Sequence, residues 1–139
     1  MEGLIKWKGM NLFVTGKGIE NCQIYLNEIP MTGTHSISIK IIWNGPIFLG
    51  VSGYPFESIG NQAWIGSDIY PLSWSYWDTG TKCNDSLPTS YGPQFEANSV
   101  ITIIVNRELK TLSFEKDGED LGKAFDLPEI SLYFAISMT

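Results

Sequence analysis

The last third of the chain constrains the fold most, because it reads as one strand after another separated by short polar turns. The run Val100–Val105 is rich in β-branched residues, and apolar and polar residues alternate through Leu109–Lys116. The pair Asp117-Gly118 tolerates the positive φ angles of a two-residue hairpin turn before a further strand at Leu121–Phe125. In Leu132–Met138 large apolar side chains recur at every second residue. This segment predicts antiparallel sheet and no helix.

The rest of the chain carries more short strands of the same kind. They are predicted at Leu4–Lys8, Asn11–Thr15, Gln23–Leu26, His35–Trp43, Phe48–Gly53, Trp64–Ser67 and Leu72–Trp77. Gly80–Tyr91 is predicted as a polar loop, longer than most connections and therefore a candidate for function. Two antiparallel sheets packed face to face, a β-sandwich, accommodate so many short strands most economically. The expected core contains Trp43, Trp74, Ile103, Leu112, Phe114, Phe134 and Ile136.

Composition bounds the domain count and the partners. The chain has 139 residues, of which 43% are hydrophobic, enough for one core and too few residues for two, so we expect a single domain over residues 1–139. A net charge of −6 repels phosphate backbones and anionic lipids, so neither nucleic acid nor a membrane is expected as a partner. The N-terminus lacks a signal-peptide pattern, and no apolar run approaches the ~20 residues of a membrane span. A soluble, intracellular, cytoplasmic monomer is expected.

Little in the sequence suggests catalysis, a metal or a cofactor. The single histidine, His35, opens a strand on its predicted buried face, which favours a structural histidine bonded to backbone over a general base. Cys22 and Cys83 are interpreted as free thiols, and with His35 they are too few and too widely spread for a zinc site. The acidic run Asp117–Asp120 lacks the alternating carboxylates of a calcium loop. Asn84-Asp85-Ser86 matches the N-glycosylation pattern, a match that short motifs often give by chance.

Three segments together resemble the SPRY domain family. Gly50-Val51-Ser52 resembles its short "GVA" strand, Ile65–Asp68 followed by Ser73–Tyr76 resembles its "GSD…SWGW" signature, and the order of strands from Val100 to Ser137 resembles its C-terminal half. The resemblance covers roughly residues 30 to 138 and is closest in pattern to the SPRY domains of F-box and SOCS-box proteins. It implies an all-β fold, a SPRY-type antiparallel β-sandwich of the concanavalin-like jelly-roll kind.

The resemblance also implies a function and a place for it. SPRY domains are non-enzymatic interaction modules, in which inter-strand loops at one end of the sandwich form a shallow, preformed pocket for a short peptide or a loop of a partner protein. Such a module can serve as the substrate-recognition part of a ubiquitin-ligase or scaffold assembly. Where SOCS-box relatives carry a tyrosine before the "LVGSD" segment this chain has Asn61, so their peptide motif is not transferred. The single arginine, Arg107, argues against a pocket built on a bidentate Arg–carboxylate clamp.

Aromatic residues in loops are the main candidates for partner contact, because they bury large areas at small conformational cost. Tyr54, Pro55 and Phe56 follow a strand in a loop that helps to form the ligand surface of related SPRY domains, and Tyr70 lies in a second loop. Trp77 has the opposite strand parity to the predicted core residue Trp74 and is expected to be exposed. The candidate partner-binding residues are Lys17, Glu20, Tyr54, Pro55, Phe56, Asn61, Tyr70 and Trp77. The alternative, that the aromatic residues simply pack the loops onto the sandwich, stays open.

Two other classes of function stay open as well. A glycan-binding, lectin-like sandwich would look alike, and Trp77, Tyr54 and Tyr70 could stack on sugar rings. A structural or self-association domain is the second alternative. Because SPRY domains usually have one more strand after the segment resembling Leu132–Met138, Leu4–Lys8 is expected to pair beside that strand and cover its edge.

Overall fold

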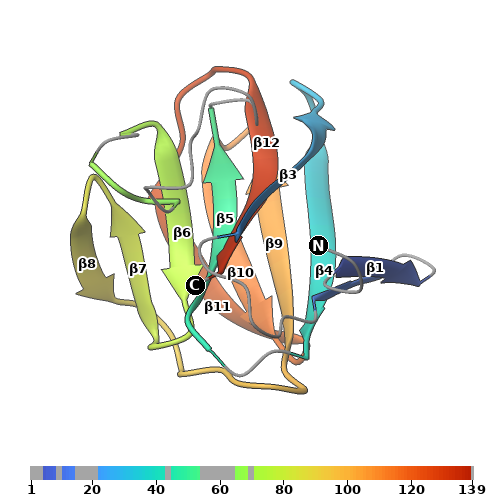
Figure 1. Ribbon diagram of the computed structural model, residues 1–139. Coiled ribbons are helices and arrows are strands. Elements are labelled where there is room, and N and C mark those ends of the chain that lie inside the picture. Colours follow the sequence, from blue (N-terminus) through green and yellow to red (C-terminus); the bar gives the residue numbers. More distant parts are fainter. Residues whose placement is uncertain are drawn as a thin grey trace.

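The computed structural model describes residues 5–8, 11–14, 22–42, 45–53, 65–68 and 71–138, and within these ranges the chain forms strands and turns without a helix. Accordingly, the described residues include no helix that could span a bilayer. The strands are β1 (Ile5–Lys8), β2 (Asn11–Val14), β3 (Cys22–Ile29), β4 (Thr34–Ile41), β5 (Ile47–Ser52), β6 (Ser73–Trp77), β7 (Thr81–Asn84), β8 (Leu87–Ser90), β9 (Val100–Asn106), β10 (Thr111–Lys116), β11 (Glu119–Asp126) and β12 (Leu132–Met138). They form two sheets packed face to face (Figure 1), so the predicted β-sandwich is confirmed.

The two sheets interleave distant parts of the chain. The first sheet has the order β1-β2-β4-β9-β10-β11 and the second the order β3-β12-β5-β6-β7-β8. Neighbouring strands are antiparallel except β2 and β4, which run parallel. The strand β12 lies between β3 and β5, and β1 pairs with β2 in the other sheet. The prediction that Leu4–Lys8 covers the edge of the C-terminal strand is therefore wrong, because β3 already occupies that edge.

The core lies between the sheets and follows the period-two pattern of the sequence. In β9 the alternate residues Ile101, Ile103 and Val105 have no exposed surface, whereas the residues between them are half-buried. Trp74 is 6% and Phe134 9% exposed. Six of the seven predicted core residues are buried, namely Trp74, Ile103, Leu112, Phe114, Phe134 and Ile136. The seventh, Trp43, lies outside the described residues.

Two predicted segments differ from the structure. Gly80–Tyr91 is not a loop but contains the hairpin β7–β8, whose two-residue turn Asp85-Ser86 has φ angles of 55° and 56°. The sequence of this hairpin is polar and has no period-two pattern, so it does not predict strands, although two non-glycine residues at positive φ form a recognised hairpin turn. In the predicted strand Trp64–Ser67, the described residues Ile65–Ser67 form a turn. The N–H groups of Ile65 and Gly66 donate to serine side chains, and the carbonyl oxygen of Gly66 accepts from the N–H of Ser86.

The sandwich has two ends, which we name for one residue at each. At the Asp78 end β4 finishes at Ile41, β5 begins at Ile47 and β6 finishes immediately before Asp78. At the Arg107 end β9 finishes immediately before Arg107, and the guanidinium of Arg107 contacts the carbonyl oxygen of Ile29 at the end of β3. Figure 1 shows β4, β5, β6 and β9 running between these two ends.

Candidate functional site

Of the eight sequence-predicted site residues, the structure describes one. Trp77 ends β6, and its half-buried indole ring packs on Phe48 of β5 with ring centroids 4.7 Å apart. Its indole N–H donates to the Ser75 hydroxyl at 2.8 Å, which fixes the ring against the sheet. Trp77 is therefore less exposed than predicted. The other seven lie outside the described residues: Lys17, Glu20, Tyr54, Pro55, Phe56, Asn61 and Tyr70.

The strand ends that lead into the predicted loops lie at different ends of the sandwich. Phe48 pairs with Trp77 at the Asp78 end, whereas Ser52 pairs with Ser73 at the other end of the same two strands. The chain enters the segment that contains Tyr54 directly after Ser52 and Gly53, so Trp77 is not beside that point of entry. In contrast, β2 finishes and β3 begins at the Asp78 end, on either side of the segment that contains Lys17 and Glu20.

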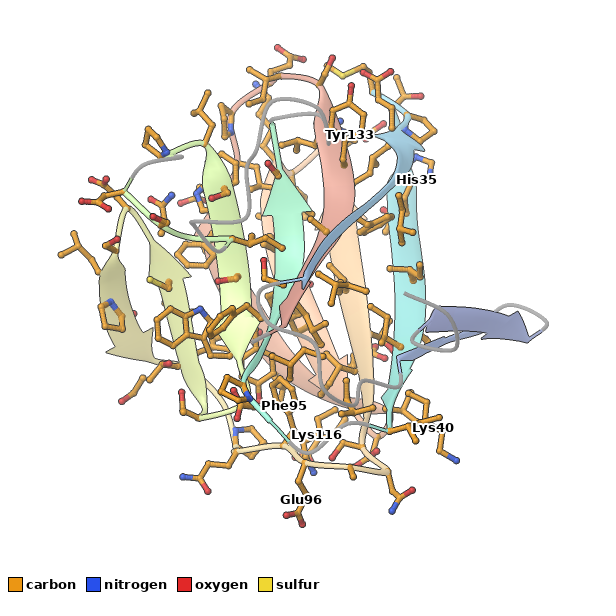
Figure 2. The ribbon with its side chains drawn as sticks, viewed as in Figure 1. His35, Lys40, Phe95, Glu96, Lys116 and Tyr133 are labelled. Carbon is orange, nitrogen blue, oxygen red and sulfur yellow. The ribbon has the colours of Figure 1, made fainter. Side chains whose placement is uncertain are left out.

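An open groove marks the Asp78 end. It consists of two adjoining hollows of about 260 Å³ and about 400 Å³, which share Asp78, Phe95 and Glu96. Phe95 is 4% exposed and contributes to an apolar floor, while Glu96 projects from the rim into solvent (Figure 2). The described residues that line this Asp78 groove are Ile41, Gly45, Pro46, Ile47, Asp78, Thr79, Gln94, Phe95 and Glu96.

Backbone hydrogen bonds hold Asp78 in the groove. The N–H of Ile47 donates to Asp78 Oδ1 at 3.2 Å, and the N–H of Asp78 donates to the carbonyl oxygen of Ile47 at 3.1 Å. The N–H of Phe95 donates to the carbonyl oxygen of Asp78 at 3.0 Å. Asp78 therefore joins the start of β5, the end of β6 and the segment that carries Phe95. Its carboxylate is positioned by the N–H of Ile47.

The groove is acidic. Burial raises the pKa of the Asp78 carboxyl, and the hydrogen bond from the Ile47 N–H opposes that shift without cancelling it. The ion pairs of the described residues are Lys110–Glu129, Lys116–Asp117 and Lys123–Asp126, and none of them includes Asp78 or Glu96. Within the described ranges, the two groove carboxylates thus lack a cationic partner.

Replacing Asp78 by asparagine should change the pH dependence of stability. Because its pKa is raised, the folded protein binds this proton more tightly than the unfolded chain, so wild-type stability falls as the pH rises through the folded pKa. Asp78→Asn removes this titration and keeps an oxygen for the Ile47 N–H. The variant should therefore be at least as stable as the wild type near pH ~7, and its advantage should shrink towards pH ~4, as measured by melting temperature.

Asp117 provides a control of opposite sign. The hydrogen bond from the Val100 N–H, together with Lys116, lowers the pKa of the Asp117 carboxyl. Its stabilising effect is present at neutral pH and is lost as the pH falls through the folded pKa. Asp117→Asn should therefore lower the melting temperature near neutral pH and have less effect in acid. If Asp78→Asn behaved in the same way, the carboxylate of Asp78 would not be an unfavourable charge in the fold.

The "GSD" segment proves to be structural. Three serines on the face of the second sheet that points away from the core bind the turn above them. The N–H of Ile65 donates to Ser137 Oγ at 3.1 Å, the N–H of Gly66 donates to Ser73 Oγ at 2.7 Å, and Ser75 Oγ donates to the carbonyl oxygen of Ile65 at 2.7 Å. Gly66 has a φ of +98°, and a Cβ there would lie 2.7 Å from the carbonyl oxygen of Cys83.

The N-glycosylation match is also part of this structure. Both bonds from Asn84 Nδ2 go to backbone carbonyl oxygens, that of Pro71 at 2.8 Å and that of Ser73 at 2.9 Å. The hydroxyl of Ser86 donates to Asp68 Oδ1 and accepts from the Asp68 N–H. The amide nitrogen that would carry a glycan is thus already engaged within the fold, which explains the motif without a modification.

The remaining chemically notable residues serve the fold. His35 is half-buried near the Arg107 end, and its Nε2–H donates to the carbonyl oxygen of Thr32 at 2.6 Å, as predicted for a structural histidine. Cys83 is a buried free thiol, and burial raises its pKa, so it is mostly protonated at neutral pH. The side chain of Cys22 lies outside the described part. Among the described residues no group of three or more His, Cys, Asp or Glu side chains could hold a metal ion.

Sequence comparison places this sandwich in a family. The SPRY domain family matches residues 43–139. F-box/SPRY domain-containing protein 1 of Homo sapiens is 31% identical over 110 residues, which cover 70% of this chain and 38% of that protein. The protein of the same name from Drosophila erecta is 32% identical, with coverage of 70% and 43%. The chain thus spans about two fifths of the length of these curated relatives.

Solved structures have the same fold. The SPRY domain of human HERC1 superposes with a TM-score of 0.69 at 20% sequence identity, covering 99% of this chain and 82% of that one. A second human SPRY domain gives a TM-score of 0.70 at 18% identity, with coverage of 97% and 88%. The structure is thus an all-β sandwich of the SPRY type. The chain belongs to the SPRY domain family, whose members are protein-interaction modules and generally not enzymes.

Proposed function

We propose that this SPRY domain binds a short peptide or a surface loop of a partner protein at the Asp78 end of the sandwich. The observation that carries the proposal is the Asp78 groove, where an apolar floor and two carboxylates lie together between the two sheets. Such a concave surface with few, well-placed polar groups is typical of ligand sites. The Trp77–Phe48 pair belongs to the proposed surface, and β2 and β3, between which Lys17 and Glu20 lie in the sequence, finish and begin at the same end.

The other predicted loop residues form a competing location for the same function. The segments with Tyr54, Pro55, Phe56 and Asn61, and with Tyr70, connect to described residues away from Trp77. We place the binding surface at the Asp78 end because the groove there contains two carboxylates that lack a cationic partner among the described residues. In the named relatives a SPRY domain accompanies an F-box, so we further propose that this domain acts as the recognition part of a larger assembly.

A selection from a library of short random peptides tests the proposal. Peptides that bind the wild-type domain should be enriched, and their affinities, measured by fluorescence anisotropy, should fall on Asp78→Asn and stay unchanged on the double variant Tyr54→Ala, Phe56→Ala. Failure to enrich any peptide would contradict the proposed function. Affinities that respond only to the Tyr54 and Phe56 changes would keep peptide binding but move it to another surface.

Binding should not need a metal ion. The described residues offer no metal site, and the only histidine bonds to backbone near the opposite end of the sandwich. Peptide affinity should therefore be the same with and without EDTA, and it should survive His35→Ala, provided that circular dichroism shows the variant to be folded. Loss of binding in EDTA alone would instead support a metal-dependent lectin, and a glycan array would then be the decisive assay.

A further inference from the structure

We propose that the Asp78 groove takes a cationic side chain, Lys or Arg, from the partner segment. This inference rests on the proposed function and names the chemistry that the groove recognises. The groove contains one fixed carboxylate inside and a second, Glu96, at its rim. It is this combination of a positioned charge with an apolar floor that selects the ligand class.

The carboxylate of Asp78 is prepared for a charged partner. Its Oδ1 accepts the Ile47 N–H, and the reciprocal bond from the Asp78 N–H keeps the backbone in place, so the side chain need not reorganise when a ligand arrives. A hydrogen bond between an ammonium or guanidinium group and such a carboxylate is stronger than one between neutral groups. Half-burial strengthens it further, because water screens the pair less than on an open surface.

The apolar floor suits the stem of the same side chain. Three apolar residues line the groove, and the exposed fraction of each is at most 4%: Ile41, Ile47 and Phe95. Lys and Arg carry several methylene groups that pack along apolar walls while the charged head reaches a polar site. Pro46 is exposed at the rim, and Ile42, which follows Ile41, is 44% exposed. A basic residue next to an apolar one would therefore cover more of this surface than a basic residue alone.

Among the described residues, the lysines of neighbouring elements do not pair with the groove carboxylates. Lys116, at the end of β10, pairs with Asp117 at 3.1 Å. Lys40 lies on β4 at a position that alternates with the core residues Ile39 and Ile41, so it belongs to the outward face of the first sheet. Figure 2 shows both lysines at the same end of the sandwich as Glu96. With a net charge of −6, the whole chain also attracts basic segments and repels acidic ones.

A charge-neutral ligand variant tests the inference on the intact 139-residue chain. The probes are peptides selected from the random library on the wild-type domain, each synthesised again with Arg replaced by citrulline or Lys by acetyl-lysine. On the wild type, neutralising the basic residue should weaken binding about ten- to a hundredfold, the size expected for a lost charge-assisted bond. On Asp78→Asn the charged and neutral peptides should bind with nearly equal, weak affinity.

Asp126→Asn is the matched control. It makes the same chemical change and the same change in net charge, but Asp126 ends β11 at the Arg107 end and pairs with Lys123. It should leave the effect of neutralising the peptide intact. The inference would be overturned if the selected peptides lacked a basic residue. It would also be overturned if neutralising the peptide weakened binding to Asp78→Asn as much as binding to the wild type. Either result would leave peptide binding in place. If no peptide bound at all, the proposed function itself would fall, and the inference with it.

Discussion

Trp74→Ala should lower the free energy of unfolding by about 3–5 kcal/mol, the range found for buried aromatic truncations. Trp74 is 6% exposed in the middle of β6, pairs across the sheet with Val51 and belongs to the core between the two sheets. Removing its indole leaves a cavity that strands held in two hydrogen-bonded sheets can close only in part. Unfolding in denaturant, monitored by circular dichroism, measures the loss.

Trp77→Ala is the matched control for this prediction. Trp77 lies on the same strand, but its side chain is half-buried on the opposite face and packs on Phe48. Its removal should lower the free energy of unfolding by about 1–2 kcal/mol, because Trp77 buries less apolar surface than Trp74 and its removal leaves no enclosed cavity. Equal losses for the two tryptophans, or a Trp74→Ala protein as stable as the wild type, would show that Trp74 is not the core residue described.

Arg107→Met should destabilise the fold by about 3 kcal/mol, because hydrogen bonds to a charged group are each worth about 1.5–3 kcal/mol and the carbonyls that remain are desolvated. Arg107 is 8% exposed. Its guanidinium donates to the carbonyl oxygens of Ile29, Pro30 and Ile130 at 3.1, 2.9 and 3.0 Å. These bonds join the end of β3 to the segment before β12, and no other described side chain replaces them.

Arg107→Lys separates charge from geometry. Lysine keeps the positive charge but lacks the planar guanidinium group that reaches three carbonyl oxygens. The stability of Arg107→Lys should therefore lie between those of the wild type and Arg107→Met. The same thermal or denaturant unfolding experiment measures both variants. If Arg107→Met unfolded at the same denaturant concentration as the wild type, the three bonds would contribute nothing net to the fold.

The sequence predicted the parts of the fold that follow a period. Alternation placed Ile103, Leu112 and Phe114 in the core, and Asp117-Gly118 gave the hairpin turn, with φ angles of 51° and 84°. Turn chemistry without an apolar pattern was harder to interpret, so the β7–β8 hairpin was predicted as a loop. The pairing of the N-terminal segment was wrong because strand order is set by long-range contacts, which a local pattern does not contain.

The candidate site was harder to predict, because no single segment forms it. The Asp78 groove brings together residues near positions 45–47, 78–79 and 94–96, which have no shared pattern. One local feature could have indicated it, namely an isolated carboxylate, Asp78, directly after the aromatic strand β6. A second local pattern indicates the contacts that Ser73, Ser75 and Ser137 make with the turn. These small residues alternate with aromatic or apolar ones, which leaves one face of the sheet flat enough for another segment to pack on it.

The location of the bound peptide is the central claim, and a nitrogen-15 chemical-shift titration tests it most directly. A library-selected peptide is added to the labelled domain, and the backbone amides that shift are mapped onto the structure. The largest changes should cluster at the amides of Gly45, Ile47, Asp78, Thr79 and Gln94–Glu96, and the amides around Arg107 should stay unchanged. Changes centred on Gly53 and Leu72, with none at Asp78, would contradict this location.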